Sequence, residues 1–180
     1  GNALPGDYVV STGCHGLSRL GLALLTSEQL PSEVQISHGL TSRAINAHKR
    51  PYPAVEALNA LIESKPDLMS WRAAGTDSSD GLIESIRGIC FSSNCQAVIS
   101  KTSILKDPLW PKDSNWNKWI LNGGEDFELI LSLPKEWAEA LSRKLKSAKI
   151  IGFIKKGKPN IFWDNLEEIN IEKSSLFKHF

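Results

Sequence analysis

Two aspartates, Asp77 and Asp80, lie three positions apart in the sequence GTDSSDGL, residues 75–82. If Ser78 and Ser79 begin a helix, both carboxylates project to the same side, because residues three apart are neighbours on a helical turn. Two close carboxylates favour a hard cation such as Mg²⁺, which commonly joins carboxylates to substrate phosphates. The free N–H groups of a helix start also favour an anion. The sequence therefore suggests a Mg²⁺–phosphate site in which Ser79 donates to a phosphate oxygen.

An ordinary helix start explains the same residues without a ligand. Aspartate and serine are the favoured residues at a helix N-cap, and acidic residues stabilise a first helical turn. Taken alone, GTDSSDGL favours this simpler interpretation. A calcium-binding EF-hand loop is excluded, because the twelfth position from Asp77 is Gly88 rather than an acid.

A second acidic segment, NGGEDFEL at residues 122–129, shifts the balance towards a site. Gly123 and Gly124 are typical of a turn, but such a turn also exposes backbone N–H groups to a ligand, with Glu125 and Asp126 beside them. Two glycine-bearing acidic segments at the ends of strands in one small domain are harder to explain as caps alone. The second segment therefore favours a Mg²⁺–phosphate site at GTDSSDGL over a simple helix cap.

Hydrophobic periodicity predicts the elements that position these segments. Strands are expected near residues 8–10, 71–76, 96–100, 127–133, 150–154 and 161–163, and helices near residues 17–29, 42–49, 54–64, 82–90 and 134–146. Strands and helices alternate, with some antiparallel pairing near the C-terminus. The predicted fold is a single α+β domain over residues 1–180, in which helices pack on a mixed β-sheet.

Several local expectations follow from the same pattern. Thr41 is expected to cap the helix at 42–49, and the last two strands are expected to pair as a hairpin around residues 156–158. In the helix at 54–64 one apolar face contains Val55, Leu58, Leu61 and Ile62. The tryptophan-rich segment 110–119 is expected to pack in the core or against another domain, and an aromatic wall for a substrate is the alternative.

Composition excludes some classes of partner. The 180 residues carry a net charge of +1, so no overall field attracts nucleic acid or an anionic membrane. No apolar run is long enough to span a bilayer, and no signal peptide precedes the first strand. Cysteine is used sparingly, which favours a cytoplasmic protein. The chain lacks an initiator Met and starts almost at once with a strand, so we expect a piece of a longer protein.

Five segments together resemble a known family. In chain order they are PGDYVVSTG with GLALL, KRPYP, DSSDGL, GGEDFEL and IIGFI. In this order and spacing they are similar to the C-terminal half of the thiamine-monophosphate kinase family, within the aminoimidazole ribonucleotide synthetase-like superfamily. The resemblance covers nearly the whole chain, and the pair DSSDGL and GGEDFEL is its most specific part.

The resemblance implies an enzyme that uses ATP and Mg²⁺ to phosphorylate thiamine monophosphate to thiamine diphosphate. It implies that Asp77 and Asp80 bind metal and that Ser79 contacts the nucleotide. Glu125 matches a substrate-binding acid, and Phe177 matches an aromatic residue that contacts the thiamine moiety. No residue of this half is implied as a nucleophile, because the substrate phosphate itself attacks the γ-phosphoryl group.

The resemblance also implies what this chain lacks. In the family, most metal ligands and much of the ATP site come from an N-terminal half, so the piece alone is not expected to turn over, and the full-length protein is expected to form a homodimer. Ser78 stands where the family usually has an apolar β-branched residue, and Asn122 and Phe127 replace a common Ser and Tyr. Two alternatives remain: another ATP-using member of the superfamily, such as an amidoligase-type synthetase or a maturation factor, or a non-catalytic binding or dimerisation domain.

Overall fold

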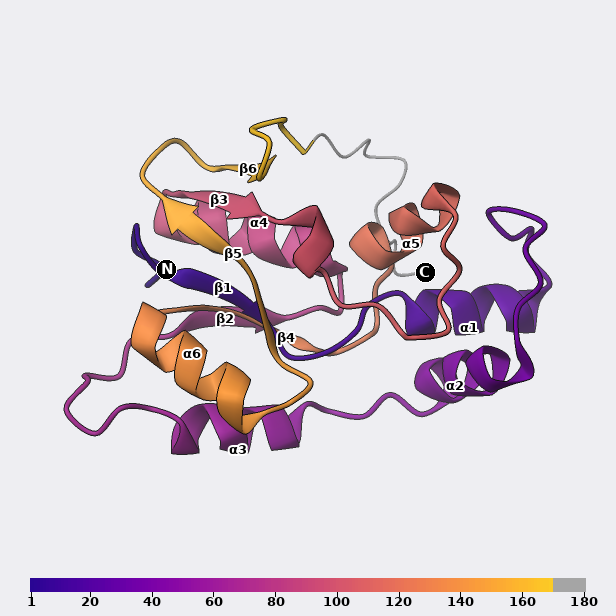
Figure 1. Cartoon of the computed structure of the whole chain (residues 1–180), viewed down its shortest axis with the longest axis horizontal. Helices are drawn as coiled ribbons and strands as arrows, with labels where there is room; N and C mark the ends of the chain where they lie inside the picture. The colour runs from indigo at the N-terminus through magenta and orange to yellow at the C-terminus, as the bar shows by residue number, and fades with distance from the viewer. Residues whose placement is uncertain (170–180) are drawn as a thin grey trace.

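One six-stranded mixed sheet forms the centre of the molecule, in the strand order β2-β4-β1-β5-β3-β6 (Figure 1). The computed structural model describes residues 1–169. The strands are β1 (Tyr8–Ser11), β2 (Ala74–Asp77), β3 (Gln96–Ile99), β4 (Leu129–Leu133), β5 (Lys149–Lys155) and β6 (Asn160–Trp163). The central strand β1 pairs antiparallel with both β4 and β5, and β6 pairs parallel with β3. The sheet is therefore mixed, as the sequence predicts.

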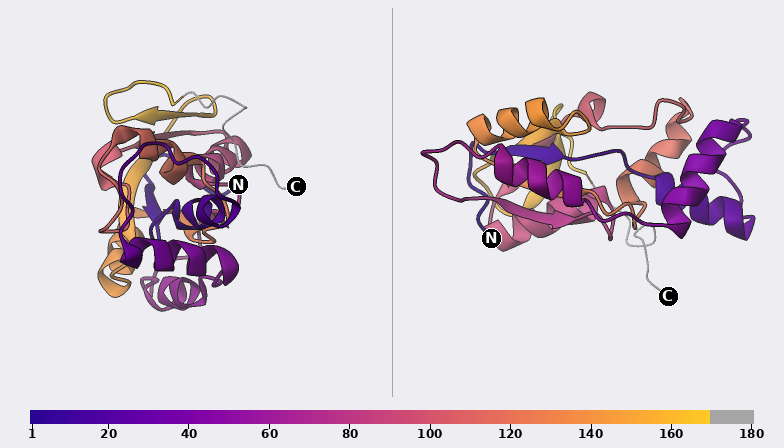
Figure 2. Two further views of the ribbon diagram at one scale, coloured as in Figure 1. Left: turned by 90° about the vertical axis from the view of Figure 1, so that its right-hand side faces the viewer. Right: turned by 90° about the horizontal axis from the view of Figure 1, so that it is seen from below.

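Within residues 1–169, six α-helices and two short 3-10 turns accompany the sheet. The helices are α1 (Leu17–Thr26), α2 (His38–Lys49), α3 (Val55–Glu63), α4 (Leu82–Ser93), α5 (Asn117–Asn122) and α6 (Lys135–Lys144), and the 3-10 turns are η1 (Lys101–Ser103) and η2 (Ser114–Trp116). Helices α1, α2 and α5 gather at one end of the molecule, beyond the ends of strands β1 and β4 (Figure 2). None of the helices within residues 1–169 combines the length and apolar character needed to cross a membrane.

The sheet buries a core on each of its faces, because neighbouring residues of a strand point in opposite directions. Val9 belongs to the cluster that includes the apolar side of α4, whereas Val10 belongs to the cluster formed with α3 and α6. Both valines are fully buried. Strand β4 is covered in the same way, so its Ser132 is buried and donates a hydrogen bond to Asp7. The alternation of apolar and other residues over 127–133 is typical of a partly buried strand, but β4 is buried on both faces, so that expectation from the sequence is wrong.

The predicted C-terminal hairpin is also wrong. Strands β5 and β6 do not pair with each other, because β3 lies between them and bonds to both. Local sequence favoured the hairpin, since a Gly-bearing basic turn joins the two strands. Pairing β6 with β3 instead buries Ile161 in the core next to α4.

Two helical predictions need correction. Helix α2 begins at His38 with Ser37 as its cap, whose side chain accepts from the N–H of Leu40, so Thr41 lies inside the helix and is not its cap. In α3 the side chains of Val55, Leu58 and Ile62 are about half exposed, and the buried residues are Ala57, Ala60 and Leu61. The alanines let α3 approach α6, whose buried Trp137 donates its indole N–H to the carbonyl of Leu61.

Candidate functional site

The GTDSSDGL segment forms a tight turn between β2 and α4. Asp77 ends the strand, and its Oδ1 accepts hydrogen bonds from the N–H of Ser79 at 3.0 Å and from the hydroxyl of Ser79 at 2.5 Å. Gly81, with φ of 99°, precedes the first helical residue, Leu82. The sequence suggested that a helical turn aligns Asp77 and Asp80. Instead, Asp77 ends β2 and Asp80 lies in the turn that comes before the helix.

Both aspartates nevertheless line one pocket, which we call the aspartate pocket. It has a volume of about 600 Å³ and lies along the edge strand β2 and the adjoining side of α4. Asp77 and Asp80 are exposed there, and Glu84, in the first turn of α4, also lines it. Carboxylate oxygens are the donors that Mg²⁺ prefers, so this donor set fits such an ion. Within residues 1–169, however, no group of three or more His, Cys, Asp or Glu side chains is placed to hold a metal ion.

The GGEDFEL segment runs directly against the aspartate turn. The N–H of Glu125 donates to the carbonyl oxygen of Ser79 at 2.8 Å, and the N–H of Glu128 donates to the buried hydroxyl of Ser78 at 3.1 Å. Glu125 adopts a φ of 63°, a left-handed conformation that is uncommon outside glycine. The structure thus joins the two acidic segments into one hydrogen-bonded unit.

Gly123 enables the close packing of this unit. A Cβ at this position would lie 2.3 Å from the carbonyl oxygen of Trp119, closer than a real Cβ can approach. The first glycine of the segment is therefore required by packing against α5. Gly123 and Gly124 are both buried, so neither presents an open surface to a ligand.

Asp126 has a structural role that the sequence did not reveal. Its buried carboxylate accepts hydrogen bonds from the N–H groups of Gly16 at 2.7 Å and Ser18 at 3.0 Å, so it caps the start of α1 from a distant part of the chain. Burial raises the pKa of Asp126 to about 7, and the two backbone donors act in the opposite direction. His15 Nδ1 lies 4.0 Å from this carboxylate, and burial lowers the pKa of His15 to about 4.

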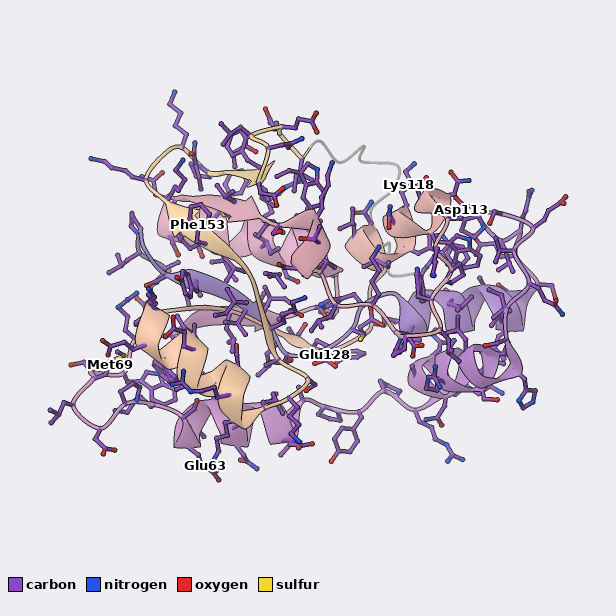
Figure 3. All side chains as sticks on the ribbon, viewed as in Figure 1. Glu63, Met69, Asp113, Lys118, Glu128 and Phe153 are labelled. Carbon is purple, nitrogen blue, oxygen red and sulfur yellow. The ribbon has the colours of Figure 1, made fainter. Side chains whose placement is uncertain are left out.

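Glu125 lines a second pocket, which we call the glutamate pocket, with a volume of about 400 Å³. Glu128 also lines it, at the point where the chain enters β4 between the sheet and the helical end (Figure 3). Thr12 donates its hydroxyl to Glu128 at 2.6 Å, and burial raises the pKa of Glu128. Cys14 faces the same pocket, and burial raises its pKa to about 11, so its thiol stays protonated and is a poor nucleophile.

The KRPYP segment supplies another wall of the glutamate pocket through Arg50, Pro51 and Tyr52. Arg43 of α2 also lines it, but its guanidinium donates two hydrogen bonds to Asp107, at 2.7 and 2.8 Å. That contact holds the pKa of Asp107 below its ordinary value. The guanidinium of Arg43 is thus already paired with the carboxylate of Asp107. Arg50, in contrast, is exposed at the surface.

The site residues suggested by the sequence therefore line two different pockets. Asp77 and Asp80 line the aspartate pocket, whereas Glu125 lines the glutamate pocket. The hydrogen bond from the N–H of Glu125 to the carbonyl of Ser79 joins the two segments that carry these residues. Ser79 itself donates to Asp77, so its hydroxyl must turn to reach a phosphate. Phe177 lies outside the described residues.

The tryptophan-rich segment packs in the core. Trp116 is fully buried, Trp110 is almost so, and the two rings meet edge to face with centroids 5.9 Å apart. Trp119 also meets Trp116 edge to face, and the guanidinium of Arg19 lies over its ring. These contacts favour the structural interpretation of residues 110–119 over a substrate wall.

Sequence comparison finds close relatives. The chain is 46% identical to thiamine-monophosphate kinase of Prochlorococcus marinus over 179 residues, which is 99% of this chain and 54% of the relative. It is 38% identical to thiamine-monophosphate kinase of Synechococcus elongatus, covering 97% of this chain and 52% of the relative. The chain thus spans about half the length of these curated relatives. No protein-family model matches it.

Structural comparison identifies the same fold in solved structures. AaThiL complexed with AMPPCP and TMP superposes with a TM-score of 0.74 at 24% identity, covering 99% of this chain and 53% of the other. HypE of Escherichia coli superposes with a TM-score of 0.57 at 17% identity, covering 94% of this chain and 50% of the other. At these identities the comparison shows the fold alone, and that fold is the aminoimidazole ribonucleotide synthetase-like one implied by the sequence.

Proposed function

Because the chain belongs, over the half of their length that it spans, to the thiamine-monophosphate kinase family, we propose that it is the substrate-side, C-terminal part of such a kinase. The complete protein would transfer the γ-phosphoryl group of ATP to thiamine monophosphate and so form thiamine diphosphate. The observation that carries this proposal is the relationship at 46% identity, which extends over 99% of the chain. The solved relative that holds an ATP analogue together with TMP supports both substrates.

The aspartate pocket is the proposed phosphate end of the site. Asp77 and Asp80 would hold Mg²⁺ there, and the exposed carboxylates on one pocket wall support this assignment. When bound, the metal would neutralise the charge of the phosphate oxygens. Ser79 would donate to a phosphate of the nucleotide after turning away from Asp77. Because phosphoryl transfer depends mainly on position and charge, these residues need no nucleophile among them.

The glutamate pocket is the proposed binding site of the thiamine moiety. Thiamine carries a permanently cationic thiazolium ring, and the pocket offers the carboxylates of Glu125 and Glu128. Glu125 is the residue we assign to the substrate, and Phe177 is the aromatic partner that we propose from the family resemblance. The substrate phosphate would then extend towards the aspartate pocket and attack the γ-phosphoryl group directly.

We further propose that the remaining half of the protein precedes this chain and completes the metal and ATP sites. The relatives are about twice as long as the chain, which agrees with a missing domain. The described residues also offer too few ligands for a metal cluster of their own. The isolated chain would then fail to turn over, and the complete protein would be a cytoplasmic homodimer.

A kinase assay on the full-length protein tests this function. Wild-type protein should convert thiamine monophosphate to thiamine diphosphate with ATP and Mg²⁺, and the isolated chain should not. Asp80→Asn should lower kcat/KM by at least about 100-fold, because several kcal/mol of charge stabilisation at the phosphates would be lost. Asp67→Asn, at an exposed loop aspartate, is the matched control and should change nothing. A full-length protein that phosphorylates no thiamine ester would exclude the proposal.

A further inference from the structure

Helices α1 and α2 approach each other unusually closely at Gly21. A Cβ at this position would lie 2.1 Å from the carbonyl oxygen of Ala44 and 2.8 Å from the Cβ of His48. Only glycine therefore allows the last turn of α2 to lie so near α1. This approach brings the imidazole of His48 to the start of α1, beside the GGEDFEL segment.

His48 makes two contacts there through the same ring nitrogen. Its Nδ1 lies 3.0 Å from the hydroxyl oxygen of Ser18 and 3.5 Å from Oε2 of Glu125. An ionised carboxylate only accepts hydrogen bonds, so Nδ1 must carry the hydrogen for the contact with Glu125 to be attractive. Ser18 is buried, and its backbone N–H donates to Asp126. The two neighbouring acids, Glu125 and Asp126, are thus both held at the same end of the helical pair.

Glu125 needs such a support because of its position. Its backbone is left-handed, and its side chain is about one-third exposed at the pocket wall. An exposed glutamate samples several rotamers, and a ligand that binds only one of them must restrict the others. A neighbour that holds the carboxylate in place before binding reduces this entropic loss.

We infer that His48 is a positioning residue for Glu125, the carboxylate that we assign to substrate binding. This inference rests on the function proposed above. His48 does not line the glutamate pocket, so it acts through Glu125 rather than on the substrate. Ser18 contacts the same ring nitrogen and helps to fix the imidazole ring. The role differs from that of a catalytic group, because removing His48 should weaken binding of the cationic substrate and leave the nucleotide unaffected.

A double-mutant cycle in the full-length protein tests this inference. His48→Ala should raise KM for thiamine monophosphate about tenfold, because the carboxylate of Glu125 loses a polar neighbour, and leave KM for ATP unchanged. Glu125→Gln should raise the same KM. The double variant should be no worse than Glu125→Gln alone, because His48 then has no carboxylate to hold. His38→Ala, an exposed histidine on the same helix, is the matched control.

Two further measurements separate positioning from a merely structural role. His48→Asn places an amide N–H near the position of Nδ1, so it should recover most of the lost affinity. Urea unfolding of the 180-residue chain should also show a coupling free energy between His48→Ala and Glu125→Gln. Equal effects on both substrates, additive effects on KM or absence of coupling in unfolding would each overturn the inference. If wild-type protein itself does not use thiamine monophosphate, the proposed function fails instead.

Discussion

The N–H of Glu125 donates to the carbonyl oxygen of Ser79 at 2.8 Å, and this bond joins the two acidic segments of the chain. Asp77 and Asp80, on the first segment, line the aspartate pocket, and Glu125, on the second segment, lines the glutamate pocket. Because this bond ties the two segments together, we expect the phosphate end and the thiamine end of the proposed site to keep a fixed spacing. A substitution in one segment should therefore be tested for effects on both substrates.

Ser79→Ala tests the proposed nucleotide contact. The hydroxyl of Ser79 donates to Asp77, and we propose that it turns to a phosphate when ATP binds. Its removal should raise KM for ATP by about three- to tenfold, the value of one hydrogen bond, with little change in KM for thiamine monophosphate. Steady-state kinetics with each substrate varied in turn would measure this. A larger effect on thiamine monophosphate than on ATP would contradict the assignment.

Ser78→Val should destabilise the chain, although valine resembles the apolar residue usual in the family. The buried hydroxyl of Ser78 accepts the N–H of Glu128, and an apolar side chain would leave that donor unsatisfied. We expect a loss of about 1–3 kcal/mol in the free energy of unfolding, measured in urea. Ser142→Ala is the control, because the buried hydroxyl of Ser142 has no hydrogen-bond partner within the described part of the chain. An equal loss in both variants would show that the bond to Glu128 contributes nothing.

The stability of the chain should respond to pH through two buried groups with opposite effects. Burial lowers the pKa of His15 from 6.5 to about 4, so the unfolded chain binds a proton that the folded chain does not, and stability falls as the pH drops through this range. Burial raises the pKa of Asp126 from 3.8 to about 7, so the folded chain binds the extra proton and stability rises as the pH drops. The two effects overlap between about pH 4 and 6.5 and partly cancel.

Asp126→Asn should therefore lose stability more steeply on acidification than wild type. The variant retains the effect of His15 but lacks the compensating proton uptake at position 126. Urea unfolding at several pH values between about 4.5 and 7.5 would give both slopes. Wild-type and variant curves that run parallel would show that Asp126 does not take up a proton in the folded chain.

Leu58→Ser and Leu61→Ala should separate the exposed and buried sides of α3. Leu58 is about half exposed, so its replacement should change the free energy of unfolding by less than about 0.5 kcal/mol. Leu61 is buried next to Trp137, so its truncation should cost about 2–5 kcal/mol. The two leucines lie on one helix of the isolated chain, which makes them a matched pair. Comparable losses would mean that the face of Leu58 is covered in solution.

The sequence predicted most elements of the fold because their periodicity is strong. The apolar residues of α4 that recur at helical spacing between Leu82 and Cys90 are buried, and the α+β class follows from the alternation of strands and helices. Where prediction failed, a distant partner decided the outcome. Nothing local to residues 150–163 indicates that β3 comes between β5 and β6. In α3 the large apolar side chains suggested which face is buried. The face that packs against Trp137 and is buried instead contains two alanines and Leu61.

The candidate site was predictable in its residue types but not in its arrangement. The spacing of Asp77 and Asp80 predicted that they lie close together, and both line one pocket. The role of Asp126 as a cap of α1 depends on a fold that joins residues far apart in the chain. The contact of His48 with Glu125 depends on the missing side chain of Gly21. Sequence spacing carries no signal of either contact.

The position of β1 at the centre of the sheet has a consequence for how the chain is made. Tyr8 pairs with Leu133 on one side and with Phe153 on the other, so during synthesis β1 must wait for two strands that lie much later in the chain. Until those strands are made, Val9 and Val10, which are buried in the folded chain, stay exposed and can bind other apolar surfaces. Such long-range pairing slows folding and prolongs exposure to aggregation. A nascent chain stopped before β4 should therefore depend on chaperones, whereas one extended past β5 should not.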